Sequence, residues 1–251
     1  LNQVKKNSEL ISLQNEQALL IAKKEKAETD IFALIESTET IQKNIQSPLI
    51  STTEPLTQVR VPDVDCLLGD KFTTIAPKTI GIPIDPNKVL EIGKQLYDLD
   101  FLFDHSSNID NVRASFMSMA AQEISYRHKK ILIGDVLDDS FEFCLTAAFQ
   151  GSRNKDMFSV ITEAIKRVRN FSIEKWGYTL DDALRVSGKL AYLGQLFKTE
   201  STFEKYSSSA PVSDWVIDNF DYNKINKIKK RSLEAFYYWF KAFELMGLSS
   251  K

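Results

Sequence analysis

Proline is distributed very unevenly along this chain, and its distribution limits where helices can form. Six of the seven prolines lie within residues 47–86, whereas residues 1–46 contain neither glycine nor proline. Proline lacks an amide proton and clashes with the preceding helical turn, so a dense run of prolines disfavours helices and central strands. We therefore predict an N-terminal helical arm over 1–46, an extended connector over 47–86 and a helical remainder.

The predicted arm has a narrow apolar face. Apolar residues recur at every seventh position along one line of a heptad seam, namely Leu13, Leu20, Ala27, Leu34 and Ile41. The second line of the seam is interrupted by Gln17, Lys24 and Thr38. Such a helix needs a partner surface, either its own domain or a neighbouring subunit, and the pattern does not choose between them.

The predicted connector is long for a compact domain and is typical of a wrapping arm. Within it, residues 59–61 and 72–75 have the composition of short strands.

Beyond the connector, helical periodicity continues almost to the end of the chain. The expected helices cover about 87–99, 109–127, 137–149, 161–171, 180–197 and 224–248. Thr179 and Asp182 have the spacing of a capping box at the start of one helix. The last helix is aromatic on more than one face, which predicts burial all round. We expect a mainly α, two-lobed core with an N-lobe over 87–150 and a C-lobe over 151–251.

Composition and motifs exclude several classes of protein. No apolar run reaches the length of a membrane span, so we expect no membrane insertion. Neither a phosphate-binding glycine loop nor a zinc-ligand spacing is present, and we expect no cofactor, no metal and no enzymatic activity. Cys66 and Cys144 lie in apolar surroundings and fit small buried side chains of a reduced intracellular protein. A metal-dependent nuclease using Asp135, Asp138 and Asp139 is the least favoured alternative.

Charge is segregated along the chain although the totals nearly cancel, with 32 basic and 34 acidic residues. Acidic side chains gather in 85–110, whereas 224–231 contains five basic side chains and no acid. Such segregation allows a near-neutral protein to have a positive groove. Aromatic side chains interleaved with the basic clusters could stack on unpaired bases, or could simply lie in the core. The pattern leaves both interpretations open.

Three segments in this basic region resemble motifs of one viral family. Residues 111–117 (NVRASFM) resemble, with one residue inserted, the NVVSFNK motif of emaravirus nucleoproteins. Residues 154–157 (NKDM) and 177–180 (GYTL) lie where that family has NRLA and GYEF. Emaravirus nucleoproteins coat the segmented negative-strand RNA of plant viruses.

The resemblance implies a two-lobed helical nucleoprotein with single-stranded RNA in the cleft between the lobes. It implies two partners besides RNA: further copies of the chain, joined through terminal arms, and a viral polymerase. The expected location is the cytoplasm of the host cell and the virion.

From the basic clusters and the resemblance together, we predict an RNA-binding set. The cations that would neutralise phosphates are Arg113, Arg127, Lys129, Lys130, Arg153, Lys155, Lys166, Arg167 and Arg169, and Tyr178 would stack on a base. The main alternative is an intracellular scaffold or adaptor, with a coiled-coil arm and no nucleic acid.

Overall fold

A computed structural model describes residues 61–127, 130–169, 177–199 and 201–249, and the structural statements below concern these residues. They form helices and contain no β-strand, which confirms the mainly α prediction. The α-helices are α2 (Val64–Phe72), α3 (Val89–His105), α4 (Ile109–Arg127), α5 (Ile133–Ala148), α6 (Lys155–Arg169), α7 (Leu180–Lys198) and α8 (Leu233–Leu245). The 3₁₀ helices are η1 (Thr73–Ile75), η2 (Pro86–Lys88), η3 (Val212–Asp214) and η4 (Asn223–Lys230). The predicted arm and residues 47–60 of the connector lie outside the described residues.

None of the described helices combines the length and the apolar character needed to cross a membrane. The described residues cluster as one compact unit. Helices on both sides of residue 150 pack on each other, α3 on α6 and α5 on α7. The division into two lobes at that residue stays a prediction.

In the described part of the connector, residues 64–75 are helical where an extended chain was predicted. Helix α2 lies inside the proline-rich segment and continues into η1, so the strand predicted over 72–75 is also wrong. Pro62 precedes α2 and Pro77 follows η1, so proline bounds these helices without interrupting them. The Asp63 carboxylate accepts a hydrogen bond from the Cys66 amide at 2.7 Å and caps the helix.

Helix α2 approaches α4 very closely, and this contact requires a glycine. A Cβ atom at Gly69 would lie 2.2 Å from the Val112 carbonyl oxygen of α4. The missing side chain therefore lets the two backbones meet. Helix α2, which lies within the predicted connector, is thus part of the core.

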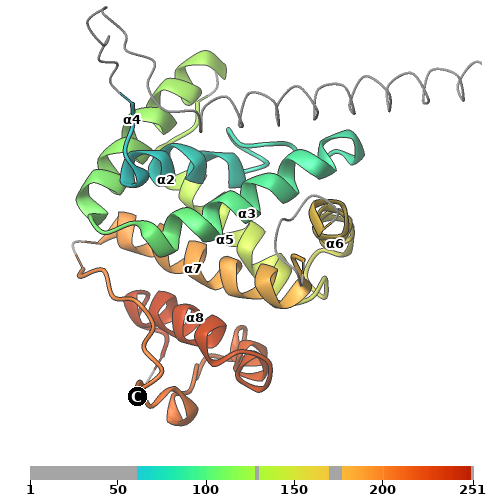
Figure 1. Ribbon diagram of the computed structural model, residues 1–251, viewed down its shortest axis with the longest axis vertical. Helices are drawn as coiled ribbons and strands as arrows, with labels where there is room; N and C mark the ends of the chain where they lie inside the picture. The colour runs from blue at the N-terminus through green and yellow to red at the C-terminus, as the bar shows by residue number, and fades with distance from the viewer. Residues whose placement is uncertain (1–60, 128–129, 170–176, 200, 250–251) are drawn as a thin grey trace, which may run out of the picture. The chain divides into compact units, whose positions relative to one another are not determined.

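Helix α7 is the centre of the described fold. It packs against α3, α5 and α8, and its residues are buried continuously from Val186 to Phe197 (Figure 1). Its predicted start is confirmed: the Thr179 hydroxyl and the Asp182 carboxylate form a capping box. A helix buried on all sides must have apolar or paired side chains around its whole circumference.

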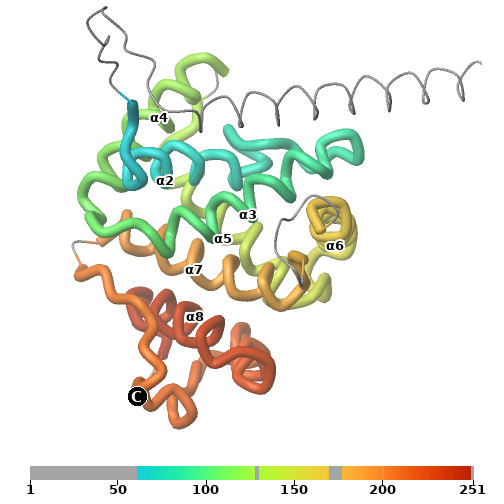
Figure 2. Tube along the Cα trace, viewed as in Figure 1, coloured from blue at the N-terminus to red at the C-terminus, as the bar shows by residue number. Residues whose placement is uncertain are grey.

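The C-terminal region consists of two helices where one was predicted. The chain leaves α7, passes beside α8 through η3, and then forms η4 and α8 (Figure 2). The Ser232 hydroxyl accepts a hydrogen bond from the Ala235 amide at 3.0 Å and starts α8 as a separate helix. The aromatic side chains from Phe236 to Phe243 are at most 5% exposed, which confirms their predicted burial.

Candidate functional site

The structure separates the predicted RNA-binding side chains, and Arg113 has a structural role. Its Nη2 donates to the carbonyl oxygens of Leu196 and Thr199 at the end of α7, each at 2.9 Å. Its Nη1 pairs with Asp110 at 2.7 Å. Carbonyls at a helix C-terminus lack partners within their own helix, so Arg113 caps α7 from α4. This guanidinium is not free for phosphate.

Arg127 lies at the other end of α4, and its guanidinium also has partners within the protein. Its Nη2 donates to the Ile80 carbonyl oxygen, and it lies 3.7 Å from the Glu123 carboxylate. Lys130 is exposed and has no partner among the described residues. Lys129 lies outside the described residues.

The remaining predicted cations lie on and just before α6. Lys155 and Arg169 are exposed. Lys166 and Arg167 share one carboxylate, that of Glu163, at 3.9 and 3.2 Å. Exposed pairs of this kind stabilise a helix weakly and exchange readily with solvent, so these cations stay accessible to a ligand.

Tyr178 is not available for stacking, so this prediction is wrong. Its side chain is 4% exposed and packs edge-on against Tyr97 at a centroid distance of 5.7 Å. Burial holds the pKa of its hydroxyl well above the usual range. Gly177 before it has φ +66°, and a Cβ there would clash with the Arg169 side chain. The GY pair therefore serves packing.

Helix η4 presents a row of lysines that the predicted set omitted. In a 3₁₀ helix with three residues per turn, side chains at i and i+3 are eclipsed. Ile225 and Ile228 follow one edge and are at most 4% exposed. A second edge carries Lys224, Lys227 and Lys230, all exposed and without a partner among the described residues. Their spacing along the helix axis is about 6 Å.

The third edge of η4 holds the helix in place. The Asn226 side chain exchanges two hydrogen bonds with the Ile217 backbone, both at 3.0 Å. The Lys229 ammonium donates to the carbonyl oxygens of Ser213 and Trp215 at 3.2 and 2.6 Å. Because these contacts fix the rotation of η4 about its own axis, the edge with Lys224 and Lys227 must face outward.

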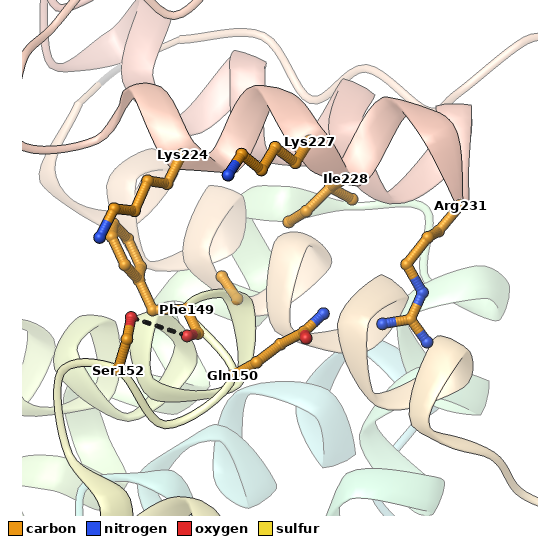
Figure 3. Close-up of a pocket in the computed structure, with 8 residues that line it drawn as sticks. Phe149, Gln150, Ser152, Lys224, Lys227, Ile228 and Arg231 are labelled. Atoms are coloured by element: carbon orange, nitrogen blue, oxygen red, sulfur yellow. Dashed lines mark hydrogen bonds between the residues drawn. The ribbon is translucent and has the colours of Figure 1, made fainter.

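A cavity of about 210 Å³ lies between η4 and the loop after α5, and we call it the cationic pocket. It is lined by Ala148, Phe149, Gln150, Ser152, Lys224, Lys227, Ile228 and Arg231. Three of these side chains are cations, and the lining contains no carboxylate. Figure 3 shows Lys224, Lys227 and Arg231 along the η4 wall, opposite Phe149, Gln150 and Ser152. Such a surface attracts anions.

Neighbouring contacts shape this pocket at both ends. Arg231 forms an ion pair with Asp181 at 2.6 Å. The Arg153 guanidinium stacks over the Phe149 and Tyr222 rings at 5.2 and 5.6 Å. Arg153, the one predicted cation beside the pocket, thus ties the loop to the start of η4.

The loop wall of the pocket turns sharply at two residues in the left-handed region. Gln150 has φ +49° and Gly151 has φ +78°. The Gly151 and Gln150 amides donate to the carbonyls of Thr146 and Ala147 at 3.2 and 3.1 Å, as in a Schellman motif. Glycine is the usual residue at the Gln150 position of this motif, because other side chains are strained there by about 1 kcal/mol or more. The turn points the Gln150 amide toward η4 (Figure 3).

A second hollow, of about 650 Å³, lies beside Arg113 and is lined by the α3–α4 loop and residues 201–203. Its lining cation is Arg113, whose pairing with Asp110 and two carbonyls is described above. This hollow therefore offers less positive charge than the cationic pocket.

A second cluster of charge is buried between α3, α7 and α8, and we call it the inner network. The Lys189 side chain is 0% exposed, and its ammonium lies 2.7 Å from Asp100, 2.6 Å from Asp104 and 3.7 Å from Glu234. Arg185 pairs with Asp100 at 2.7 Å. Burial alone would lower the pKa of Arg185, but the hydrogen bond and charge of Asp100 outweigh burial and raise it. These cations are neutralised within the fold.

The acidic residues of the nuclease alternative have separate structural partners. Asp135 caps α5 at the Leu132 amide, and Asp138 pairs with Lys198 at 2.6 Å. Asp139 is buried and accepts hydrogen bonds from the amides of Lys78 and Thr79. The described part of the chain contains no cluster of three His, Cys, Asp or Glu side chains that could hold a metal.

No protein-family model, curated protein or solved structure matches this chain. A functional assignment therefore depends on the geometry of the cationic pocket and on the motif resemblance. The acid-free run 224–231 was the sequence signal for the pocket, but only the 3₁₀ geometry shows which of its cations face outward together.

Proposed function

We propose that this protein binds single-stranded RNA without sequence specificity and encapsidates it as a polymerising nucleoprotein. The observation that carries the proposal is the outward row of Lys224, Lys227 and Lys230 beside a pocket with no carboxylate in its lining. Regularly spaced cations with no local partner match a regularly spaced chain of phosphates. They carry no base-reading pattern, so sequence specificity is not expected.

The rest of the proposal follows from the motif resemblance. It includes self-assembly through terminal arms, contact with a viral polymerase, and a location in the host cytoplasm and the virion. The predicted arm, residues 1–46, lies outside the described residues, and polymerisation is therefore proposed on the resemblance alone.

Salt-dependent RNA binding tests the proposal. Fluorescence anisotropy of labelled RNAs of several unrelated sequences is measured with the full chain over a range of salt concentrations. We expect similar affinities for all sequences and a linear fall of log affinity with log salt. In the variant K224Q/K227Q/K230Q, the slope should shrink by about 0.7 for each lost phosphate contact, about 2 for three.

A matched control removes three exposed lysines elsewhere, K78Q/K88Q/K94Q, from the turn after η1, from η2 and from α3. Its slope should stay close to that of the wild type, because these side chains lie outside the cationic pocket. Equal slopes in the two variants would refute the assignment of the η4 row. Absence of salt-sensitive RNA binding in the wild type would refute the function and leave the scaffold alternative.

A further inference from the structure

The cationic pocket is too small for a whole nucleotide. Pockets that enclose drug-sized ligands measure about 300–1,000 Å³. The cationic pocket measures about 210 Å³, and it is therefore matched to a small polar group. The bases and sugars of a bound strand would remain outside it, along η4.

The charge in the pocket exceeds what an internal phosphodiester can neutralise. Lys224 and Lys227 have no partner among the described residues. Arg231 contacts Asp181 through Nη2, and guanidinium offers five N–H donors, so donors remain for a ligand. An internal phosphodiester carries a single negative charge, whereas a phosphate monoester carries about −1.5 to −2 at neutral pH, with three acceptor oxygens. Two lysines without a partner and the remaining donors of Arg231 around one small cavity therefore favour a terminal phosphate over an internal one.

One neutral donor lies on the wall opposite η4. The Gln150 amide points toward η4 from a strained turn (Figure 3). The Ser152 hydroxyl lines the same wall but donates its proton to the Phe149 carbonyl oxygen at 2.9 Å. A phosphate group in the pocket would therefore accept hydrogen bonds from the cations of η4 on one side and from the Gln150 amide on the other.

We infer that the cationic pocket binds the terminal phosphate or polyphosphate group at the 5′ end of an RNA strand. This inference rests on the proposed RNA-binding function and assigns the pocket, with Lys224 and Lys227, to the strand end, and the next lysine of the row, Lys230, to the following phosphodiester. The same chemistry occurs in free nucleoside triphosphates, so the test must separate the two sources.

The experiment compares three RNAs of identical sequence, labelled at the 3′ end, that carry a 5′-hydroxyl, a 5′-monophosphate or a 5′-triphosphate. With the full chain, we expect affinity to rise in that order, about tenfold or more between the hydroxyl and the triphosphate, since hydrogen bonds to charged groups are the strongest kind. Inorganic tripolyphosphate is then added as a competitor.

Two pocket variants identify the site. K227Q removes a cation, and Q150G removes the amide while relieving the backbone strain at φ +49°, so loss of folding cannot explain its effect. Q150G should retain binding to the 5′-hydroxyl RNA, whereas K227Q should weaken that binding as well, because Lys227 belongs to the lysine row. Both variants should lose most of the preference for a 5′-phosphate. K94Q on α3 is the matched control and should keep the preference.

Equal affinity for the three RNA ends would overturn the inference while leaving the proposed RNA binding in place. A preference that K227Q and Q150G leave unchanged would overturn it as well, because the end would be bound elsewhere. Tripolyphosphate binding without any preference among RNA ends would assign the pocket to a free polyphosphate and so overturn the strand-end assignment. Failure to bind any RNA would refute the proposed function and the inference together.

Discussion

The cationic pocket and the inner network contain the same types of side chain in opposite settings. In the inner network, Lys189 is fully buried and surrounded by carboxylates from two other helices. In the cationic pocket, Lys227 is exposed and the lining contains no carboxylate. Removing one partner from a buried ion group leaves an uncompensated charge, whereas neutralising an exposed lysine changes stability little. Burial and the presence of nearby carboxylates, and not residue type, therefore separate charged side chains that stabilise the fold from those that remain available to a ligand.

The largest expected effect comes from breaking the inner network. Lys189→Met keeps the length of the side chain but leaves Asp104 without this ammonium and Asp100 with Arg185 alone. We expect the free energy of unfolding to fall by about 3–5 kcal/mol, measured by denaturant titration. Lys227→Met is the matched control and should change the free energy of unfolding by less than about 0.5 kcal/mol. Equal losses in the two variants would contradict the distinction between the clusters.

Arg113 provides an intermediate test, because it was predicted to contact RNA and is found capping α7. Arg113→Ala leaves the carbonyls of Leu196 and Thr199 without this donor. We expect a loss of about 1–3 kcal/mol in the free energy of unfolding and no change in the salt slope of RNA binding. Lys155→Ala, at an exposed position on α6, is the control and should leave stability unchanged. A smaller salt slope in Arg113→Ala would return Arg113 to the RNA-binding set.

The smallest expected effect is a pH dependence within the inner network. Burial raises the pKa of Glu234 above its ordinary value of 4.5. The folded state therefore holds this proton more tightly than the unfolded state does. Its contribution to stability is present below pH 4.5 and is lost as the pH rises through the folded-state pKa.

The measurement is urea unfolding of the wild type and of Glu234→Gln at a series of pH values. Relative to Glu234→Gln, the wild type should lose stability as the pH rises above 4.5. The salt slope of RNA binding should be the same in both proteins, since Glu234 does not line the cationic pocket. A stability difference that is flat with pH would contradict the effect of burial on this carboxyl.

Features that depend on neighbouring residues in the sequence were predictable. The start of α7 was one, because a hydroxyl and a carboxylate three positions apart cap a helix by local hydrogen bonds. Helix α4 was another, and its bounds agree with the predicted 109–127. Helix α2 was missed because proline was counted over the whole segment, although Pro62 and Pro77 lie outside the helical residues.

The roles of single side chains were much less predictable. Tyr178 lies in a basic region of the sequence, but its ring packs on Tyr97 from α3, and no local pattern reports that contact. Lys189 and Lys227 cannot be told apart by residue type, since their difference arises from which carboxylates the fold brings near them. The outward face of η4 depends on a period of three, whereas the sequence pattern was interpreted with the α-helical period.

The cationic pocket joins two segments far apart in the chain, the loop after α5 and helix η4. A ligand held between them acts as a removable cross-link, since it binds only while the C-terminal segment is docked. At a ligand concentration of a hundred times Kd, such linkage adds about 2.7 kcal/mol to the stability of the docked state. Amide hydrogens of η4 and α8 would then exchange more slowly in the bound protein. Occupancy of the pocket would thus decide how often the C-terminal segment opens.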